Sequence, residues 1–180
     1  EAIALALAEA KACADRGVKY NLIITSGFSE VGNTEEEQRI ADYGLSHGMR
    51  IVGPNISGVY SAESAMDATF GPGGILPGSV AIVTQSGALG LAMIGKTKVE
   101  NIGLSTIVSV GNKCDVDEAD LLGYLTSQKR TKVILMYIEG IKNGPRFIEA
   151  VKQATRKKPV VVIKSGRSER GAVAAASHTG

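Results

Sequence analysis

The sequence feature that most constrains the fold is a regular alternation of short apolar runs with longer segments of helical composition. The apolar runs predict strands near residues 79–84, 104–109, 132–138 and 159–164, and the segments between them predict helices near residues 87–99, 116–127 and 143–157. Each strand-plus-helix repeat has about the length that a right-handed βαβ crossover needs. The pattern therefore predicts an α/β fold with a flavodoxin-like parallel sheet between helices, in three αβα layers.

A shorter α/β pattern precedes this one, with the predicted order helix 2–16, a strand running into a turn at 18–28, helix 34–46, and a short strand with a sharp turn at 49–55. Thr34 is predicted to cap the second helix, and Glu37 three places on has the spacing of a capping box. The order helix, strand, helix, strand is that of the second half of a doubly wound sheet. We therefore expect the C-terminal half of a Rossmann-like domain.

A dense cluster of Gly and Pro at residues 71–78 separates the two patterns, because such a segment continues neither a helix nor a sheet. The predicted organisation is a Rossmann-like part at 1–70, a linker at 71–78 and a flavodoxin-like domain at 79–180. The chain opens on Glu1 without a Met and stops at Gly180. A fragment of a longer polypeptide is therefore expected.

Composition narrows the function classes. Cys13 and Cys114 are far apart and form no Cys-x-x-Cys pair, so neither a disulfide framework nor a zinc site is indicated. His47 and His178 are the only histidines, which is too few for a histidine metal cluster. The net charge of +2 favours neither nucleic acid nor a membrane surface, and no apolar run has the length of a membrane span. A cytoplasmic protein without a metal site is expected.

The end of the chain holds the residue that most needs an explanation. The β-branched run at 159–163 predicts a central parallel strand, and in open α/β sheets sites lie at the carboxyl ends of the strands. The segment that follows consists of small residues and one imidazole, His178. Such a composition favours a mobile loop that presents a nucleophile. The competing interpretation is a solvated histidine side chain.

A second candidate lies at residues 83–90, where a strand leads directly into a helix through small residues. This turn exposes the first backbone amides of the helix, at Ser86, Gly87 and Ala88, and together with the helix dipole they can bind a phosphate. The alternative is a tight βα turn in which Ser86 is only the N-cap.

A carboxylate, Glu139, follows the apolar strand at 132–138. It is either a solvated loop residue or an orienting group. If it reaches His178, it accepts a hydrogen bond from one ring nitrogen and leaves the other nitrogen nucleophilic.

The strand at 104–109 is followed by Gly111, Asn112 and Lys113, which offer backbone amides, a side-chain amide and a cation. These groups suit an acyl or phosphoryl oxygen, and an Asx turn is the competing account. Cys114 comes next, but no nearby residue provides a base to activate it as a nucleophile.

Six short motifs occur in a fixed order across nearly the whole chain: Ile-Ile-Thr-Ser-Gly-Phe at 23–28, Val-Gly-Pro-Asn at 52–55, Val-Thr-Gln-Ser-Gly-Ala at 83–88, Gly-Asn-Lys at 111–113, Ile-Glu-Gly at 138–140 and Ser-His-Thr-Gly at 177–180. In this combination the chain resembles the α-type part of the NDP-forming acyl-CoA synthetases, the succinyl-CoA synthetase superfamily. Within it, the chain most resembles the ADP-forming acetate–CoA ligases.

The resemblance implies that His178 is a phosphohistidine and that Glu139 steadies it. It also implies that Ser86, Gly87 and Ala88 cradle the phosphoryl group. Coenzyme A would be contacted in the first domain, at Thr25, Ser26, Gly27 and Asn55. Gly111, Asn112 and Lys113 are the candidates for substrate contacts.

The implied reaction interconverts acyl-CoA, ADP and phosphate with a carboxylic acid, CoA and ATP, through an acyl phosphate. Ile56 and Leu91 replace a Cys and a substrate-contacting Tyr of succinate-using members, which favours acetate or a similar small acid. ATP or ADP with Mg²⁺ would bind an ATP-grasp domain or subunit outside this chain, and an oligomer is expected. The alternatives are a sensory region of a protein acyltransferase and a non-catalytic CoA-binding module.

Overall fold

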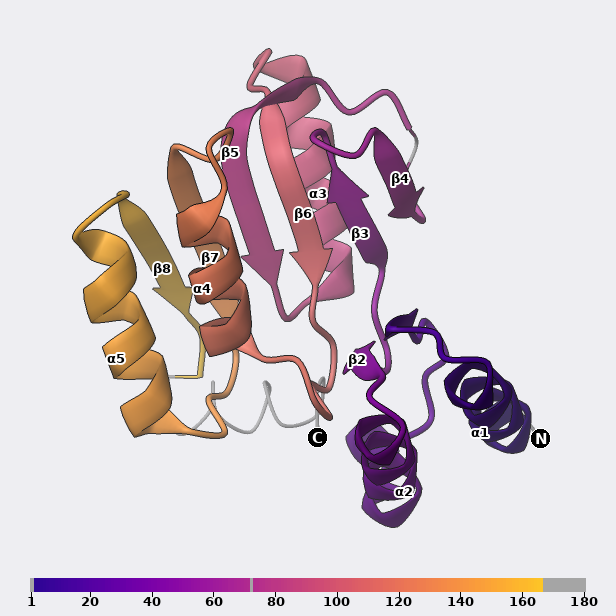
Figure 1. Ribbon diagram of the computed structural model, residues 1–180. Helices are drawn as coiled ribbons and strands as arrows, with labels where there is room; N and C mark the ends of the chain where they lie inside the picture. Colours follow the sequence, from indigo (N-terminus) through magenta and orange to yellow (C-terminus); the bar gives the residue numbers. More distant parts are fainter. Residues whose placement is uncertain (1, 72, 167–180) are drawn as a thin grey trace.

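Figure 1 shows the computed structural model of the protein, which describes residues 2–71 and 73–166. The described strands form a two-stranded sheet, β1-β2, and a six-stranded sheet in the order β4-β3-β6-β5-β7-β8. The predicted α/β class is therefore confirmed. No described helix is both long and apolar enough to cross a membrane.

The first part of the chain builds the small sheet and its two helices. Its elements are α1 (Ala2–Asp15), β1 (Tyr20–Leu22), the 3₁₀ helix η1 (Ser29–Val31), α2 (Thr34–Ser46) and β2 (Arg50–Val52). β1 and β2 are parallel, with Asn21 opposite Ile51. Buried apolar side chains from both helices and from the strand region form one core cluster: Ala10, Ala14, Ile23, Ile40, Met49 and Ile51.

The predicted capping box at the start of α2 is wrong. The N-cap is Asn33, without a side-chain cap hydrogen bond. The Glu37 carboxylate accepts hydrogen bonds from the Ser29 backbone N–H (3.1 Å) and from Asn112 Nδ2 (2.9 Å). These tertiary donors replace the local contact that the spacing predicts.

A hairpin that the sequence patterns did not predict follows, with β3 at Gly58–Ser61 and β4 at Met66–Thr69. β3 pairs antiparallel with β6, so residues 58–69 hydrogen-bond into the six-stranded sheet. Both strands are short and β4 is mostly exposed, which leaves no clear apolar alternation to detect. β5 begins at Pro77, inside the expected linker. The division into domains at residues 70 and 79 stays a prediction.

The rest of the chain builds the parallel part of the large sheet. Its elements are β5 (Pro77–Thr84), α3 (Gly87–Val99), β6 (Leu104–Ser109), α4 (Glu118–Ser127), β7 (Val133–Ile138), α5 (Gly144–Thr155) and β8 (Val160–Lys164). β6, β5, β7 and β8 are parallel in that spatial order. Counted from β5 this is the order 2-1-3-4, as in flavodoxin-like folds.

Helices cover both faces of this sheet, which gives the three predicted layers (Figure 1). α4 and α5 cover one face, where Leu122, Leu125 and Ala154 join the apolar side chains of β5 and β7. On the opposite face Ile94 of α3 packs with Ile82 and Ile107. Successive side chains along each strand point to opposite faces of the sheet, so they contribute to two separate cores.

β8 does not have the central position that its apolar run predicted. It is the edge strand of the described sheet, and Val161, Val162 and Ile163 are 40–50% exposed. A continuous β-branched run indicates a strand but does not indicate how many neighbours the strand has.

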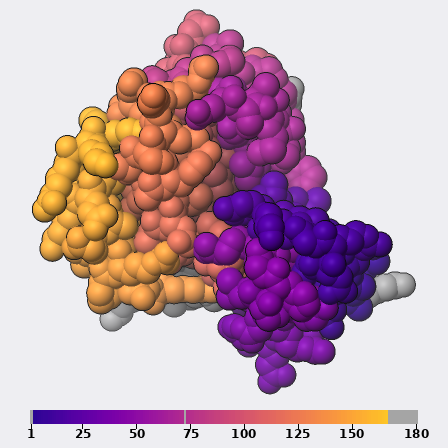
Figure 2. All heavy atoms as spheres, viewed as in Figure 1, coloured from indigo at the N-terminus to yellow at the C-terminus, as the bar shows by residue number. Residues whose placement is uncertain are grey.

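The loop after β6 joins the two parts of the chain, which lie side by side (Figure 2). The Asn112 N–H donates to Pro54 O at 2.9 Å, and the Val116 N–H donates to Ile51 O at 3.0 Å. Arg50 pairs with Asp115 at 2.8 Å. These contacts hold the turn after β2 against the carboxyl end of the large sheet.

Candidate functional site

The topology of the large sheet indicates where a ligand site should lie. Its strand order reverses at β5, whose neighbours β6 and β7 lie on opposite sides, and ligands of open α/β sheets bind outside the carboxyl ends of the strands at such a point. A hollow of about 490 Å³ lies there, lined by Ile24, Ser26, Asn55, Ile56, Ser57, Phe70, Gln85, Ser86, Gly87, Ala88, Leu91 and Glu139. It therefore brings together residues that were predicted for three different roles.

The start of α3 forms the first wall of the hollow. Ser86 is the N-cap, and its hydroxyl accepts from the Leu89 N–H at 3.4 Å. The Ser86 backbone is fixed in turn by Thr84 Oγ1, which accepts the Ser86 N–H at 3.2 Å and donates to Ser86 O at 2.8 Å. Within the described chain the amides of Gly87 and Ala88 have no acceptor. Together with the helix dipole, these amides can bind an anion.

Glu139 also lines the hollow. Its Oε2 atom is buried and has no hydrogen-bond partner among the described residues. The backbone beside it is fixed, because Gln85 Oε1 accepts the N–H groups of Glu139 (2.8 Å) and Gly140 (3.0 Å). Burying a carboxylate oxygen without a donor is costly, so this atom is suited to a ligand that carries an N–H or O–H group.

His178 lies outside the described residues, but the chain leaves β8 beside Glu139. The Ser165 N–H donates to Ile138 O at 3.0 Å, and Lys164 Nζ donates to Glu139 O at 2.7 Å. His178 follows Gly166 by 12 residues, and an extended chain of that length spans up to about 40 Å. The chain is therefore long enough for His178 to reach the hollow.

The loop predicted to contact CoA is largely occupied by internal hydrogen bonds. The Gly27 and Phe28 N–H groups donate to the Glu30 carboxylate, the latter at 3.1 Å. The Asn55 N–H donates to Thr25 O at 3.0 Å. Ser26 and Asn55 line the hollow, whereas Thr25 and Gly27 do not. The CoA contacts of all four residues stay predictions.

The loop at 111–113 is buried, and none of its residues lines the hollow. A Cβ atom at Gly111 would lie 2.0 Å from Pro54 O, so only glycine fits this approach. Asn112 Nδ2 donates to Glu30 Oε2 at 2.5 Å and to Glu37 Oε2 at 2.9 Å. Lys113 forms a buried ion pair with Glu118 at 2.5 Å and donates to Gly140 O at 2.7 Å. A role for these three residues in binding substrate stays a prediction.

Cys114 is protonated at neutral pH, as a residue that is not a nucleophile should be. Burial raises the pKa of its thiol to about 12, and the nearby carboxylates of Glu37 and Asp115 act in the same direction. A thiol in this state is a weak nucleophile.

Several residues of the hollow were not proposed as site residues from the sequence. Gln85 belongs to the motif at residues 83–88, but only its position directly after β5 shows that it lies at the site. Ser57 precedes β3 and Phe70 follows β4, and the two line the hollow together at the open end of the hairpin, where the Phe70 N–H donates to Ser57 O at 3.0 Å. Because the hairpin was not predicted, the sequence had no signal for these two residues.

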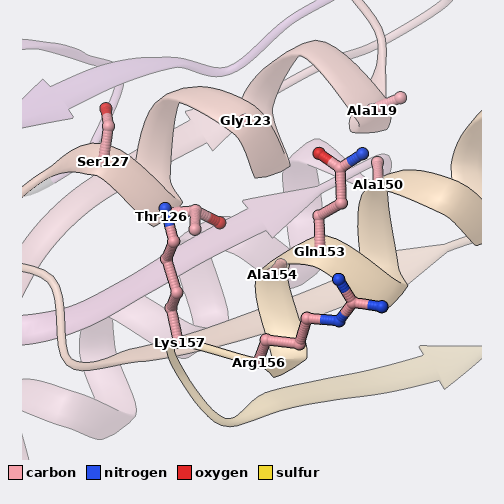
Figure 3. A pocket seen from close by; sticks show the side chains of 9 residues that line it. All are labelled: Ala119, Gly123, Thr126, Ser127, Ala150, Gln153, Ala154, Arg156 and Lys157. Atoms are coloured by element: carbon pink, nitrogen blue, oxygen red, sulfur yellow. The ribbon is translucent and has the colours of Figure 1, made fainter.

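A second hollow, of about 400 Å³, lies between α4 and α5 (Figure 3). Its walls are small side chains such as Ala119, Gly123 and Ala150, with Arg156 and Lys157 at one end. No residue predicted for chemistry lies in it. The close packing of two helices through small residues accounts for its composition.

Comparisons with known proteins agree with the motifs. Residues 77–180 match the family described as succinyl-CoA ligase like flavodoxin domain. The Pyrococcus furiosus protein named acetate–CoA ligase (ADP-forming) I subunit alpha is 53% identical over 170 residues, which cover 93% of this chain and 37% of that protein. The Methanocaldococcus jannaschii acetate–CoA ligase (ADP-forming) is 44% identical over 168 residues, which cover 93% of this chain and 24% of that protein.

A solved structure has the same fold over nearly the whole chain. It is the dinucleotide forming acetyl-coenzyme A synthetase 1 of Ca. Korarchaeum cryptofilum, in complex with phosphate and ADP. The TM-score is 0.92 at 50% identity, with 96% of this chain and 38% of that chain covered. The present chain thus spans well under half the length of the relatives that it matches.

Proposed function

Because the chain belongs to the family with the succinyl-CoA ligase like flavodoxin domain, we propose that it is the α-type part of an ADP-forming acid–CoA ligase. The reaction interconverts acyl-CoA, ADP and phosphate with a carboxylic acid, CoA and ATP. The names of the P. furiosus and M. jannaschii relatives support this assignment and favour acetate or a similar small acid.

One observation carries the proposal: the hollow is lined both by residues with unused donors and by a residue with an unused acceptor. The amides of Gly87 and Ala88 face no acceptor in the described chain, and Glu139 Oε2 has no donor there. A phosphorylated imidazole has the complementary set, because its phosphoryl oxygens accept hydrogen bonds and its other ring nitrogen donates one. The hollow therefore suits a phosphohistidine, and His178 is the histidine that we assign to it.

The proposed cycle has three balanced steps. Phosphate attacks the thioester carbonyl, the C–S bond breaks, and CoA leaves as the acyl phosphate forms. A ring nitrogen of His178 then attacks phosphorus, the bond to the acyl oxygen breaks, and the carboxylic acid leaves. Finally an oxygen of the ADP β-phosphate attacks phosphorus, the P–N bond breaks, and ATP leaves with the imidazole restored.

The chain's own residues would have distinct parts in these steps. Glu139 holds the ring N–H of His178 and stabilises the positive charge that develops on the imidazole. The start of α3, from Ser86 to Ala88, stabilises the phosphoryl oxygens. ADP with Mg²⁺ is proposed to bind an ATP-grasp partner domain or subunit, which the terminal segment would reach by moving.

CoA is proposed to approach from the first part of the chain, with Ser26 and Asn55 on the wall of the hollow and Thr25 and Gly27 behind them. Among residues 2–71 and 73–166, those that line the hollow include several apolar side chains and no Lys, Arg or His. A monocarboxylic acid fits this lining better than a dicarboxylic acid.

The test uses the full-length protein together with its ATP-grasp part. Incubation with γ-labelled ATP and Mg²⁺ should give a protein-bound label that is acid-labile and alkali-stable. The label should be absent from His178→Asn and present in His47→Asn, because His47 lies at the exposed end of α2. Label that survives His178→Asn would refute the mechanism. CoA binding without any label in the wild type would instead identify a non-catalytic module.

A further inference from the structure

The side chain of Gln85 connects the start of α3 with the loop that carries Glu139. It lies at the end of β5 and is 7% exposed. Its Oε1 atom accepts three hydrogen bonds, from the N–H groups of Glu139 (2.8 Å) and Gly140 (3.0 Å) and from Lys113 Nζ (3.3 Å). A single oxygen thus fixes the backbone that carries Glu139.

These three donors also fix the orientation of the Gln85 amide. Backbone N–H groups and an ammonium group only donate, so the atom facing them has to be the oxygen. Lys113 is itself held in place, because its side chain and that of Glu118 are 2% and 4% exposed and pair at 2.5 Å. Rotating the amide by 180° would place the Nε2 donors against three other donors.

The Nε2 end is consequently the free end of Gln85. None of the hydrogen bonds of the described chain uses this nitrogen, although Gln85 lines the hollow together with Ser86, Gly87 and Glu139. Nε2 is not among the fully buried polar atoms without a partner, so its N–H groups stay accessible from the hollow, beside the free helix amides. An anionic oxygen in the hollow would accept from them.

We propose that Gln85 is a further phosphoryl-binding residue of the reaction, an inference that rests on the function proposed above. Nε2 donates to an oxygen of the phosphoryl group that the Gly87 and Ala88 amides also bind. Oε1 keeps Glu139 in place, and the Lys113–Glu118 pair fixes which end of the amide faces the ligand. One side chain therefore sets the distance between the phosphoryl site and the carboxylate.

The variant Gln85→Glu distinguishes the role of Nε2 from that of Oε1. It is tested in the full-length enzyme together with its ATP-grasp part. Glutamate retains an acceptor for the three donors, but it replaces the Nε2 donors with a second negatively charged oxygen facing the ligand. We expect the KM for inorganic phosphate to rise at least about tenfold and labelling of His178 to slow by about 10²-fold. The KM for acetyl-CoA should change less than about threefold, which a general loss of structure would not produce.

Gln128→Glu is the matched control. Gln128, the C-cap residue of α4, is also a buried glutamine, 9% exposed, and its Oε1 accepts from Thr106 and Thr131 away from the hollow. It shows what burying an additional carboxylate does without contact with the phosphoryl group. Its KM for phosphate should match that of the wild type.

Gln85→Met provides a test without the new charge, should Gln85→Glu fail to fold. It removes both ends of the amide and should raise the KM for phosphate in the same selective way. Wild-type phosphate KM values in the folded Gln85 variants, with normal labelling of the wild type, would overturn this inference and leave the proposed function intact. Absence of label in the wild type would overturn both.

Discussion

The loops that follow β5 and β6 have similar sequences and opposite structural roles. Each places a polar residue beside glycine at the carboxyl end of a parallel strand, Gln-Ser-Gly at 85–87 and Gly-Asn-Lys at 111–113. In the second loop the side chains of Asn112 and Lys113 bind Glu30, Glu37 and Glu118. In the first loop two amides face no acceptor in the described chain. Unused hydrogen-bonding capacity, rather than residue type, distinguishes the ligand site.

The difference follows from the neighbours of each strand. β6 lies next to the hairpin, and its loop runs against the turn after β2, where Gly111 approaches Pro54 too closely for a Cβ atom. The first part of the chain supplies acceptors for that loop. β5 lies where the strand order reverses, so its loop opens into the hollow. The following predictions test this contrast, from the largest expected effect to the smallest.

Lys113→Met should be the most destabilising single change in the loop after β6. It leaves Glu118 as a buried carboxylate without its cation, which costs about 3–5 kcal/mol. Urea unfolding measures the loss. The double variant Lys113→Met with Glu118→Leu should recover most of it, because the uncompensated charge is gone. Unchanged stability together with a raised substrate KM would make Lys113 a substrate-binding residue and remove the contrast between the loops.

Glu139→Gln should have the opposite effects: little change in stability and a large loss of His178 phosphorylation. Glu139 Oε2 has no partner among the described residues, so the substitution breaks no hydrogen bond there and the Tm should stay within about 2 °C of the wild type. The rate of His178 phosphorylation should fall by about 10²–10³-fold, the loss of one preorganised electrostatic contact.

Glu149→Gln is the control for that substitution. Glu149 is an exposed residue of α5 that accepts from Gln153 at 3.0 Å, so its substitution should leave labelling unchanged. A Glu139→Gln enzyme that labels normally, or one that unfolds at a much lower temperature, would show that Glu139 has a structural role like the loop after β6.

The sequence predicted the bounds of the parallel strands and helices after residue 77 to within about two residues, because each has a strong local pattern. It did not predict the β3–β4 hairpin, the edge position of β8 or the tertiary partners of Glu37. These depend on which strands become neighbours, and local patterns do not encode that choice. The same limit applies to the site. The residue types of Ser86 and Glu139 indicated chemistry, but the hydrogen bonds of Gln85 to the loops that carry Glu139 and Lys113 depend on the tertiary structure.

Cys114, directly after the Gly-Asn-Lys loop, gives the smallest predicted effect and tests how well that loop excludes water. Burial raises the pKa of its thiol from 9.0 in the ordinary case to about 12. A pKa that is higher in the folded state stabilises the fold fully below pH 9, and this stabilisation is lost as the pH rises from 9 towards 12. The contribution lost by pH 10 is about 1–2 kcal/mol. Urea unfolding at pH 8 and pH 10 should therefore show a smaller alkaline loss of stability for Cys114→Ala than for the wild type. Equal losses in the two proteins would mean that water reaches the Cys114 thiol in the folded protein, and the loop after β6 would then not be closed to solvent.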